Sequence, residues 1–572
     1  MDSTDRDGRP RVFVAGAGLA GLTATHRLLE RGHAVTLIEA NDFIGGNLGA
    51  HCDPGDHAGG TPPPDHQTCD VCRNLPGGCP RASDWHEHCY HMYLNWYHNF
   101  WDIMAEIGAI DNFRPEPSIY NIHPRGTSDT AQPPIPMVNG GSPWTALRNL
   151  FSGYAPALDM FLLAQTSADL VAEPARRNGW LERTSISAFL QSRGYATEES
   201  LAGTYRTTAQ AFASPSYLSS ARSFKSLLSF GFRLPEPSIW LLRGPTEQMI
   251  FAPWRNYLQS RYSDRFEMRT LTSLARMEVD ATGRVSQLGL VPNKDSPTIH
   301  RGEALLPPAS RPGGLDGEYT EPVGEGDVVI LALPLSQLSA LVTPRVARWA
   351  PRLPDVRYLR TEPMISLDLF FRRRLAGIPD SITVLLNSAH EMSFFDTSQN
   401  WRGQPNDWTS LNVIASSADA LIPYGDDEIV GIMLDELKRY IAFDQSDILS
   451  CRTHVQTNVG QELFVNQVGS WEWRPGTTTG IANLFIAGDY CKTAIDVVTI
   501  EAAVVSGLMA AEAVRRRSGK GPAIRIRLPD RYPVAAVSAM AHASRPFAYM
   551  AYAGSTLDHA ARRGYRAWFP NG

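Results

Sequence analysis

Residues 11–47 read RVFVAGAGLAGLTATHRLLERGHAVTLIEANDFIGGN, and this stretch decides the fold of the first part of the chain. The short apolar run Arg11 to Ala15 predicts a β-strand, and the turn after it has the glycine spacing G-x-G-x-x-G. Such a turn lets a ligand approach the backbone closely, and the helix that starts there offers unpaired N–H groups to an anion. The stretch therefore predicts a site for the pyrophosphate of a dinucleotide.

The residues around the turn extend this prediction. The turn and the start of the helix comprise Gly16, Gly18, Leu19, Ala20 and Gly21. The helix is expected to end at Gly32, and residues 34–38 predict a second strand. Glu39 closes that strand, where its carboxylate can accept both hydroxyl groups of an adenosine ribose. Both NAD and FAD fit this stretch.

A second motif lies near the end of the chain. Residues 483–507 read NLFIAGDYCKTAIDVVTIEAAVVSG, which predicts a buried strand, a Gly-Asp loop and a helix that begins near Thr499. Together with Glu39-Ala40 and Gly45-Gly46, this resembles the flavin-containing amine oxidase and carotenoid desaturase superfamily. The usual patterns there are EA-x-x-x-x-GG-R near the start and LFLAGD…T-x-EGA-x-x-SG near the end. The cofactor that the resemblance implies is FAD.

The resemblance assigns roles to residues of both motifs. Asp489, after Gly488, would hydrogen-bond the ribityl or pyrophosphate part of FAD, and the helix after Thr499 would point its N-terminus at the flavin ring. Asn47 stands where the superfamily usually has Arg, so one phosphate contact differs. Leu274, within a strand pair that resembles the one covering the adenine, would also contact the cofactor.

The predicted fold class is α/β. A Rossmann-type FAD-binding domain would be discontinuous in sequence and would carry an α+β substrate-binding domain. With 572 residues the chain can form more than one core, since single cores stop growing near roughly 250–300 residues. The expected boundaries are 1–115, 240–350 and 475–515 for the FAD-binding domain, 116–239 and 351–474 for the substrate-binding domain, and 516–572 for a C-terminal extension.

Residues 87–109 indicate a branch of the superfamily. They read EHCYHMYLNWYHNFWDIMAEIGA, which looks like the EHG-x-H-x-F-x-x-x-Y-x-N segment of phytoene and ζ-carotene desaturases and of hydroxysqualene dehydroxylases. The motif would place Glu87, His88 and His91 near the isoalloxazine, and these are the candidates for proton transfer. A purely structural, hydrogen-bonded role for the two histidines is the alternative.

Cysteine is concentrated in one segment. Five of the seven cysteines fall between residues 52 and 89, inside or beside a Pro- and Gly-rich insertion at about 51–86. A structural zinc would stabilise such a loop, and the candidate ligands are Cys69, Cys72, Cys79 and Cys89. Reduced structural thiols, a disulfide and an iron–sulfur cluster are the alternatives.

The predicted activity follows from the cofactor. We expect an FAD-dependent oxidoreductase that dehydrogenates or rearranges a lipophilic, isoprenoid or polyene-like substrate by hydride transfer to flavin N5. The alternatives are a flavin-dependent amine oxidase, a redox-neutral isomerase or dehydroxylase, and a non-catalytic FAD-bearing scaffold. Oxygen, a quinone or a nicotinamide could each reoxidise the flavin.

The amino-acid composition limits the classes of partner that are expected. The chain has 53 basic and 59 acidic residues, a formal charge of −6, and no basic stripe, so nucleic acid is not expected as a partner. No apolar run of about 18 residues predicts a membrane-spanning helix. We expect a cytoplasmic protein, with peripheral membrane contact through the aromatic C-terminal extension as a further hypothesis.

Overall fold

A parallel five-stranded sheet organises the part of the molecule that holds the first motif. The structure is a computed structural model that describes residues 10–52, 85–125, 133–139, 142–212, 214–231, 237–294, 317–402, 407–449, 453–530 and 534–568. The strands, in spatial order, are β10 (Phe266–Arg269), β2 (Ala34–Ile38), β1 (Arg11–Ala15), β14 (Val328–Leu331) and β22 (Leu484–Ile486). Every neighbouring pair is parallel, and β2, β14 and β22 are buried along their whole length. Burial on both faces explains why these strands are continuous apolar runs.

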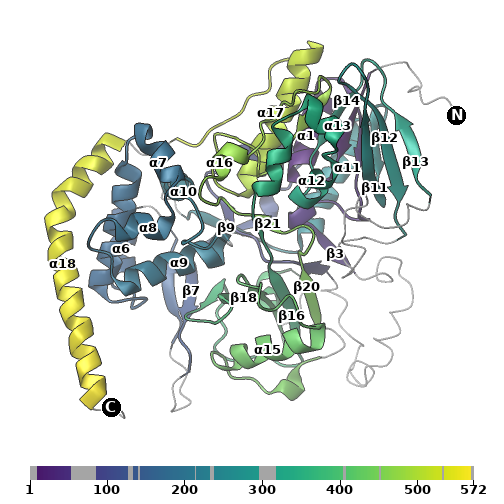
Figure 1. The fold of residues 1–572 in the computed structure, drawn as a ribbon. Coiled ribbons are helices and arrows are strands. Elements are labelled where there is room, and N and C mark those ends of the chain that lie inside the picture. Colours follow the sequence, from purple (N-terminus) through teal and green to yellow (C-terminus); the bar gives the residue numbers. More distant parts are fainter. Residues whose placement is uncertain are drawn as a thin grey trace.

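Two helices from opposite ends of the chain pack together beside this sheet (Figure 1). They are α1 (Leu19–Glu30) and α17 (Ile500–Ser518). At Gly507 of α17 an added Cβ would lie 2.3 Å from the carbonyl oxygen of Ala20, so only glycine allows this close approach. The expected end of α1 is confirmed, because Gly32 has a φ of +78° and its N–H donates to the carbonyl of Leu29.

A small antiparallel sheet lies beside the parallel one. It consists of β11 (Thr272–Val279), β12 (Val285–Pro292) and β13 (Tyr319–Pro322). Helices α11 (Ala252–Arg261), α12 (Leu335–Leu341) and α13 (Pro344–Trp349) belong to the same region of the molecule. The Rossmann-type α/β fold that the sequence predicts is confirmed.

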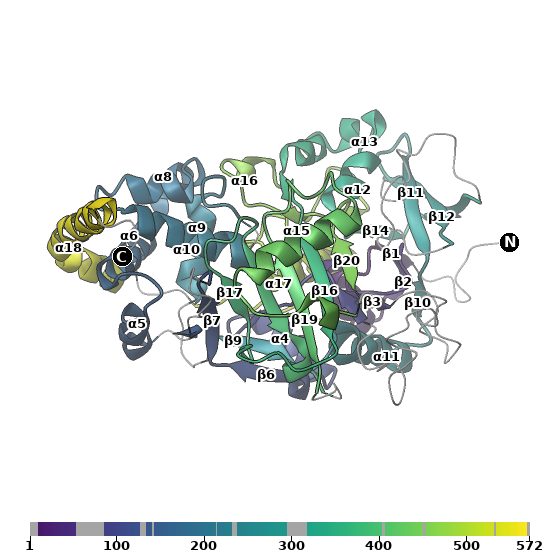
Figure 2. The same cartoon turned by 90° about the horizontal axis from the view of Figure 1, so that it is seen from below.

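A mixed seven-stranded sheet forms the second region (Figure 2). Its spatial order is β20 (His454–Thr457), β16 (Ile365–Phe371), β19 (Thr409–Ala415), β18 (Met392–Asp396), β17 (Thr383–Leu385), β7 (Ser118–Ile122) and β8 (Ile135–Val138). Helix α15 (Asp426–Lys438) shares a hydrophobic core with it, through residues such as Met433 and Leu437. Its strands β16 and β19 pair antiparallel along their whole length.

A helical region extends from the second sheet to one edge of the molecule. It contains α5 (Pro143–Leu150), α6 (Ala157–Ala172), α7 (Asn178–Glu182), α8 (Ile186–Gln191), α9 (Glu198–Phe212) and α10 (Ala221–Gly231). The long C-terminal helix α18 (Val534–Trp568) runs along α6 and forms the outer edge (Figures 1 and 2).

Short elements connect these regions. The strands are β3 (Ala50–Cys52), β4 (Trp85–Glu87), β5 (Tyr93–Leu94), β6 (Phe113–Glu116), β9 (Ile239–Leu242), β15 (Thr361–Glu362) and β21 (Leu463–Phe464). The helices are α4 (His98–Glu106), α14 (Thr397–Asn400) and α16 (Ser470–Trp473). Strands β3 and β4 pair antiparallel and flank the cysteine-rich insertion.

The two large sheets draw on different parts of the sequence. The parallel sheet uses strands between residues 11 and 38, between 266 and 331, and at 484–486, whereas the mixed sheet uses strands at 118–138 and between 365 and 457. We propose domain boundaries at 115, 240, 350, 475 and 515 on the basis of this segregation.

Candidate functional site

One cavity of about 360 Å³ lies at the carboxyl ends of β1 and β2, between the two regions. Ligands of open α/β sheets bind in crevices at this edge of the strands. Most of the predicted cofactor-binding residues line it: Gly16, Gly18, Leu19, Ala20, Glu39, Ala40, Gly45, Gly46, Asn47, Leu274, Gly488, Asp489 and Thr499. Residues from stretches that are far apart in the sequence, including 332–337 and 460–464, therefore line the same cavity.

The glycine turn has the geometry that a phosphate site requires. Gly16 has a φ of +100°, and an added Cβ there would lie 2.2 Å from the carbonyl oxygen of Ala332. Gly18 is the N-cap of α1 and offers no side chain to its N–H groups, which leaves that helix end for an anion. Gly21 does not line the cavity, and its Cβ would clash with Gly16, so it serves the close packing of turn and helix.

Glu39 is fixed at the end of β2 by hydrogen bonds to its carboxylate. One oxygen accepts from the N–H of Ala17 at 2.7 Å, and the other accepts from the backbone and side-chain nitrogens of Asn41 at 3.0 and 2.9 Å. Burial raises the pKa of Glu39, and these hydrogen bonds oppose the rise. The oxygen that accepts from Ala17 retains one lone pair, so the carboxylate can accept a ribose hydroxyl group there.

The Gly488-Asp489 loop is held by an arginine that the sequence did not reveal. The side chain of Arg474 is fully buried, and it donates to the carbonyl oxygens of Tyr490 and Cys491 at 2.8 and 2.6 Å. The carboxylate of Asp496 pairs with Arg474 at 2.7 Å and with Arg222 at 2.7 Å. The only sequence signal was an arginine within the aromatic segment 471–474, well before the motif.

Asp489 itself lines the cavity. Burial raises its pKa to about 6, and the nearby positive charge of Arg474 opposes this shift. A carboxyl group in this position can accept hydrogen bonds from hydroxyl groups of a ribityl chain.

The start of α17 also faces the cavity, through Val498, Thr499, Ile500 and Ala503. Thr499 is its N-cap, and the hydroxyl oxygen accepts from the N–H of Ala502 at 3.2 Å. The positive end of this helix dipole points into the space, as the resemblance implies for a site that stabilises negative charge.

These features fit FAD. Two helix N-termini, a glycine turn that a Cβ would fill, and two carboxylates suited to hydroxyl groups converge on one cavity. Gly18 and Gly46 face each other closely, because a Cβ added to Gly46 would lie 3.1 Å from the Cα of Gly18. The cavity thus has features suited to a phosphate group and features suited to a flavin ring.

The three predicted proton carriers are placed differently. His88 and His91 line the cavity, whereas Glu87 does not and instead borders a separate small cavity beside Asp368 and Trp401. The carboxylate of Glu87 accepts from the N–H of Thr246 at 2.6 Å, and burial raises its pKa to about 8. This differs from the position near the flavin that the resemblance implies.

The two histidines are kept neutral by burial. It lowers the pKa of His88 to about 4 and that of His91 well below its ordinary value. Both rings approach the thiol of Cys89, with Nε2 to Sγ distances of 3.4 Å in each case. Of the predicted zinc ligands, Cys69, Cys72 and Cys79 lie outside the described residues, and Cys89 lies in this cavity. The four-cysteine site stays a prediction.

Two segments of the chain match families of known proteins. Residues 313–515 match the family "Flavin containing amine oxidoreductase", and residues 14–61 match "NAD(P)-binding Rossmann-like domain". The chain is 23% identical to the zeta-carotene desaturase of Synechocystis sp. over 535 residues, 88% of this chain and 97% of that protein. It is 23% identical to the 15-cis-phytoene desaturase of Glycine max over 523 residues, 88% of this chain and 79% of that protein.

Solved structures support the fold. The structure of cyclohexylamine oxidase from Brevibacterium oxydans superimposes with a TM-score of 0.53 at 14% identity, covering 90% of this chain and 100% of that one. A putrescine oxidase bound to putrescine gives a TM-score of 0.55 at 15% identity, covering 89% and 99%. The motifs, the cavity and the family matches indicate an FAD-dependent oxidoreductase that is similar to the desaturase and amine oxidase superfamily.

Proposed function

We propose that this flavoenzyme dehydrogenates or rearranges a lipophilic, isoprenoid or polyene-like substrate. The observation that carries the proposal is an apolar wall of the cavity. The residues of this apolar wall are Met92, Leu94, Leu333, Leu335, Met364, Ile414, Leu463 and Phe464. Transfer of an apolar substrate from water to such a wall is favourable, because it removes apolar surface from water. Similarity to desaturases along 88% of the chain supports the same substrate class.

The residues of the chain would position the substrate and control protons. FAD, when bound, supplies a hydride acceptor at flavin N5. The apolar wall excludes water and holds the substrate carbon in place. His88 and His91 are neutral and line the cavity, so either can accept a proton from the substrate, and Tyr90 is fixed by a 2.6 Å hydrogen bond to Ser393.

The direct test is anaerobic bleaching of the flavin absorbance by candidate substrates. The panel should contain carotenoid precursors, squalene-type alcohols, and primary and secondary amines. Bleaching by a polyene precursor supports the proposal. Conversion of a precursor without bleaching indicates a redox-neutral isomerase or dehydroxylase. Reoxidation of the reduced enzyme by oxygen, a quinone or a nicotinamide then identifies the electron acceptor.

A variant can test the apolar wall. Met364→Gln places an amide at the wall, and burying that amide costs about 1–3 kcal/mol, so we expect the KM for an apolar substrate to rise about tenfold. The matched control is Ile110→Gln, at a side chain that is 42% exposed and away from the cavity lining. An unchanged KM in Met364→Gln would contradict binding against this wall.

Amine oxidation is the second candidate function. It is favoured by the match of residues 313–515 to the flavin-containing amine oxidoreductases. Bleaching of the flavin by an amine, but by none of the polyene precursors, would assign the protein to this activity.

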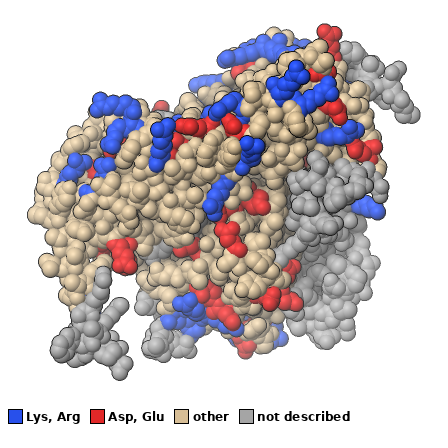
Figure 3. All heavy atoms as spheres, viewed as in Figure 1, with Lys and Arg blue, Asp and Glu red and all other residues tan. Residues whose placement is uncertain are grey.

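We also propose that the protein contacts a lipid surface, which would supply a lipophilic substrate. The part of the chain that the structure describes contains no candidate membrane-spanning helix. However, large apolar side chains are exposed on and after α5 and on α18, and the surface near α18 carries few charges in Figure 3. The most exposed are Trp144, Phe151, Met540, Phe547, Met550 and Leu557. Co-flotation with phosphatidylcholine vesicles that is weakened by Trp144→Ser with Phe547→Ser would support this contact, and absence of flotation would contradict it.

A further inference from the structure

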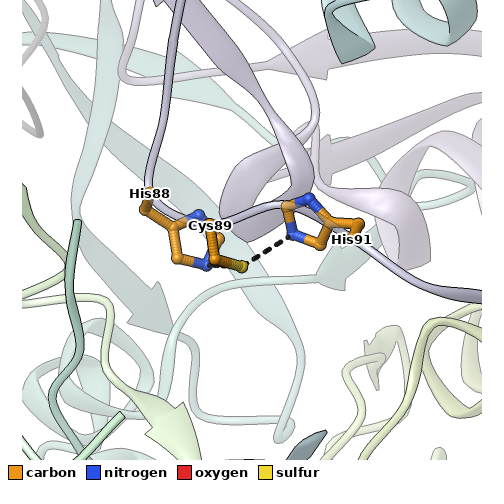
Figure 4. Close-up of side chains that lie close together, drawn as sticks. All are labelled: His88, Cys89 and His91. Carbon is orange, nitrogen blue, oxygen red and sulfur yellow. Dashed lines mark hydrogen bonds between the residues drawn. The ribbon is translucent and has the colours of Figure 1, made fainter. Parts of the chain in front are cut away.

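His88, Cys89 and His91 form a cluster on the loop between β4 and β5. Figure 4 shows the three side chains directed toward one another. The Nε2 atom of each histidine lies 3.4 Å from the Sγ atom of Cys89, and the three potential ligand atoms all lie within 4.8 Å of one another. Two imidazole nitrogens and one sulfur thus converge on a single point.

The spacing of these atoms fits tetrahedral zinc. With Zn–S of about 2.3 Å and Zn–N of about 2.0–2.1 Å, a tetrahedral angle separates sulfur from nitrogen by about 3.6 Å. The observed separation is 3.4 Å for both histidines. We propose that His88, Cys89 and His91 bind one Zn²⁺, with the thiol proton released to solvent as the Zn–S bond forms.

Two weak hydrogen bonds are the alternative explanation of the cluster. The thiol can donate to one imidazole nitrogen, and its sulfur can accept from the N–H of the other ring, but a thiol is weak in both roles. The other group of potential ligands among the described residues is His26, Glu30 and Glu106. There Arg27 already pairs with both carboxylates, at 3.0 and 2.7 Å, so this second group needs no cation.

The loop that carries the ligands is anchored on both sides. The carbonyl oxygen of Glu87 accepts from the hydroxyl of Ser366 at 3.0 Å, and the Tyr90 hydroxyl donates to Ser393. Tyr93, just after the cluster, pairs with Trp240 between β5 and β9. Anchoring of this kind holds ligand side chains close to the geometry of the bound state, which metal sites require.

The fourth position of the proposed zinc opens into the cavity. His88, Cys89 and His91 all line that cavity, together with Asn47 and the start of α17. Three protein ligands and one open position are typical of catalytic zinc sites, where water or a substrate atom completes the tetrahedron. With zinc bound, the two imidazoles act as ligands, and the open position receives a hydroxyl, carbonyl or amine group of the substrate. This step deepens the proposed function, since it selects substrates with one polar group.

The first test is the composition and the coordination of the FAD-loaded protein, purified with a reducing agent and then given Zn²⁺ alone. We expect about one zinc per flavin, and X-ray absorption at the zinc edge should show one sulfur near 2.3 Å with nitrogen or oxygen scatterers near 2.0 Å. A shell of three or four sulfurs would place the zinc in the cysteine-rich insertion and overturn the proposal. Absence of tightly bound zinc would overturn it too.

Variants locate the site independently of enzyme activity. Cys89→Ser is expected to reduce the zinc content from about one per flavin to near zero, because the thiolate ligand is lost. Cys72→Ser, within the insertion, and Cys491→Ser, a buried thiol outside the cavity lining, are the matched controls and should retain zinc. Retained flavin absorbance shows that each variant is folded. Zinc lost from Cys72→Ser but kept in Cys89→Ser would contradict the assignment.

Measuring flavin bleaching alongside zinc content tests the substrate class and the zinc site separately. If the zinc content and coordination are as expected but no polyene bleaches the flavin, the proposed substrate class fails and the metal site stands. If zinc is absent but a polyene is oxidised, the substrate class stands and the metal site fails.

Discussion

Glu501 lies in the first turn of α17 but serves a different helix. Its side chain is fully buried, and it accepts from the N–H of Asn99 at 2.9 Å and from the N–H of Phe100 at 3.0 Å, at the start of α4. A carboxylate at a helix N-terminus satisfies N–H groups that have no partner within the helix. Glu501 therefore connects α17 to α4, the helix that follows the loop with His88, Cys89 and His91.

Glu501 also predicts a pH dependence of stability. Burial raises its pKa to about 8 from an ordinary value of 4.5, so between these values the folded chain keeps a proton that the unfolded chain releases. The free energy of unfolding should therefore fall as the pH rises from about 5 to 8. Glu501→Gln removes this contribution, and urea unfolding at pH 5.5 and 8 should show a flatter dependence. Asp435→Asn, at an exposed surface pair, should leave the slope unchanged; equal slopes in all three proteins would contradict the prediction.

Substitution of Glu39 is expected to lower the affinity of the protein for FAD. In Glu39→Gln an NH₂ group must replace one oxygen, and it would face the N–H of Ala17 or of Asn41. An unpaired buried donor costs about 1–3 kcal/mol, so we expect FAD to dissociate about 10-fold more readily. Fluorescence of released flavin measures the change. Glu428→Gln, in the first turn of α15, is the control and should retain wild-type affinity.

At the scale of the element, contact between α1 and α17 depends on one glycine. Gly507→Ala would bring a methyl group to 2.3 Å from the carbonyl oxygen of Ala20, so the helices must separate, at a cost of about 1–3 kcal/mol. We expect a lower Tm and weaker FAD binding. The matched control is Gly431→Ala in α15, where an added Cβ meets nothing within 4 Å and the change should stabilise by about 0.5–1 kcal/mol. A higher Tm for both variants would refute the packing argument.

The C-terminal helix α18 is attached through two buried aspartates of α6. Asp159 accepts from Ser555 at 2.8 Å, and Asp169 pairs with Arg545 at 3.0 Å. Arg545→Ala leaves Asp169 without that partner, at a cost of about 1–3 kcal/mol, and amides of residues 534–568 should exchange faster. Arg562→Ala, which breaks only the exposed pair with Asp558, should change exchange little. Equal exchange in the two variants would indicate that α18 is held by apolar packing alone.

At the scale of the whole molecule, the cofactor site joins segments that are far apart in sequence. The cavity is lined by residues from the first 50, from the middle and from near 500, so binding of FAD stabilises contacts between all of them. At a FAD concentration about 100 times its Kd, the stabilisation is roughly 2.7 kcal/mol. We expect the Tm of the apoprotein to rise with added FAD but not with NAD; a Tm that responds to neither would contradict the site.

Local sequence patterns were sufficient to predict the secondary structure around both motifs. The strand at residues 11–15, the helix end at Gly32 and the helix after Thr499 are all as predicted, because each depends on residues within a few positions. The placement of Glu87 and the role of Arg474 could not be predicted in this way. Glu87 is satisfied by Thr246, and Arg474 holds the loop at 489–491, through contacts that no local spacing encodes.

The sequence by itself determined the cofactor class and the α/β fold, and all of the predicted cofactor-binding residues except Gly21 line the cavity. Glycine spacing, an acid at a strand end and a capped helix act over short distances, so their order along the chain is sufficient. Tertiary structure alone decided that two histidines and a cysteine converge at 3.4 Å, that Glu87 faces away, and that an apolar wall closes the cavity. These features arise where the two large sheets meet, and the positions of side chains there depend on packing between distant segments.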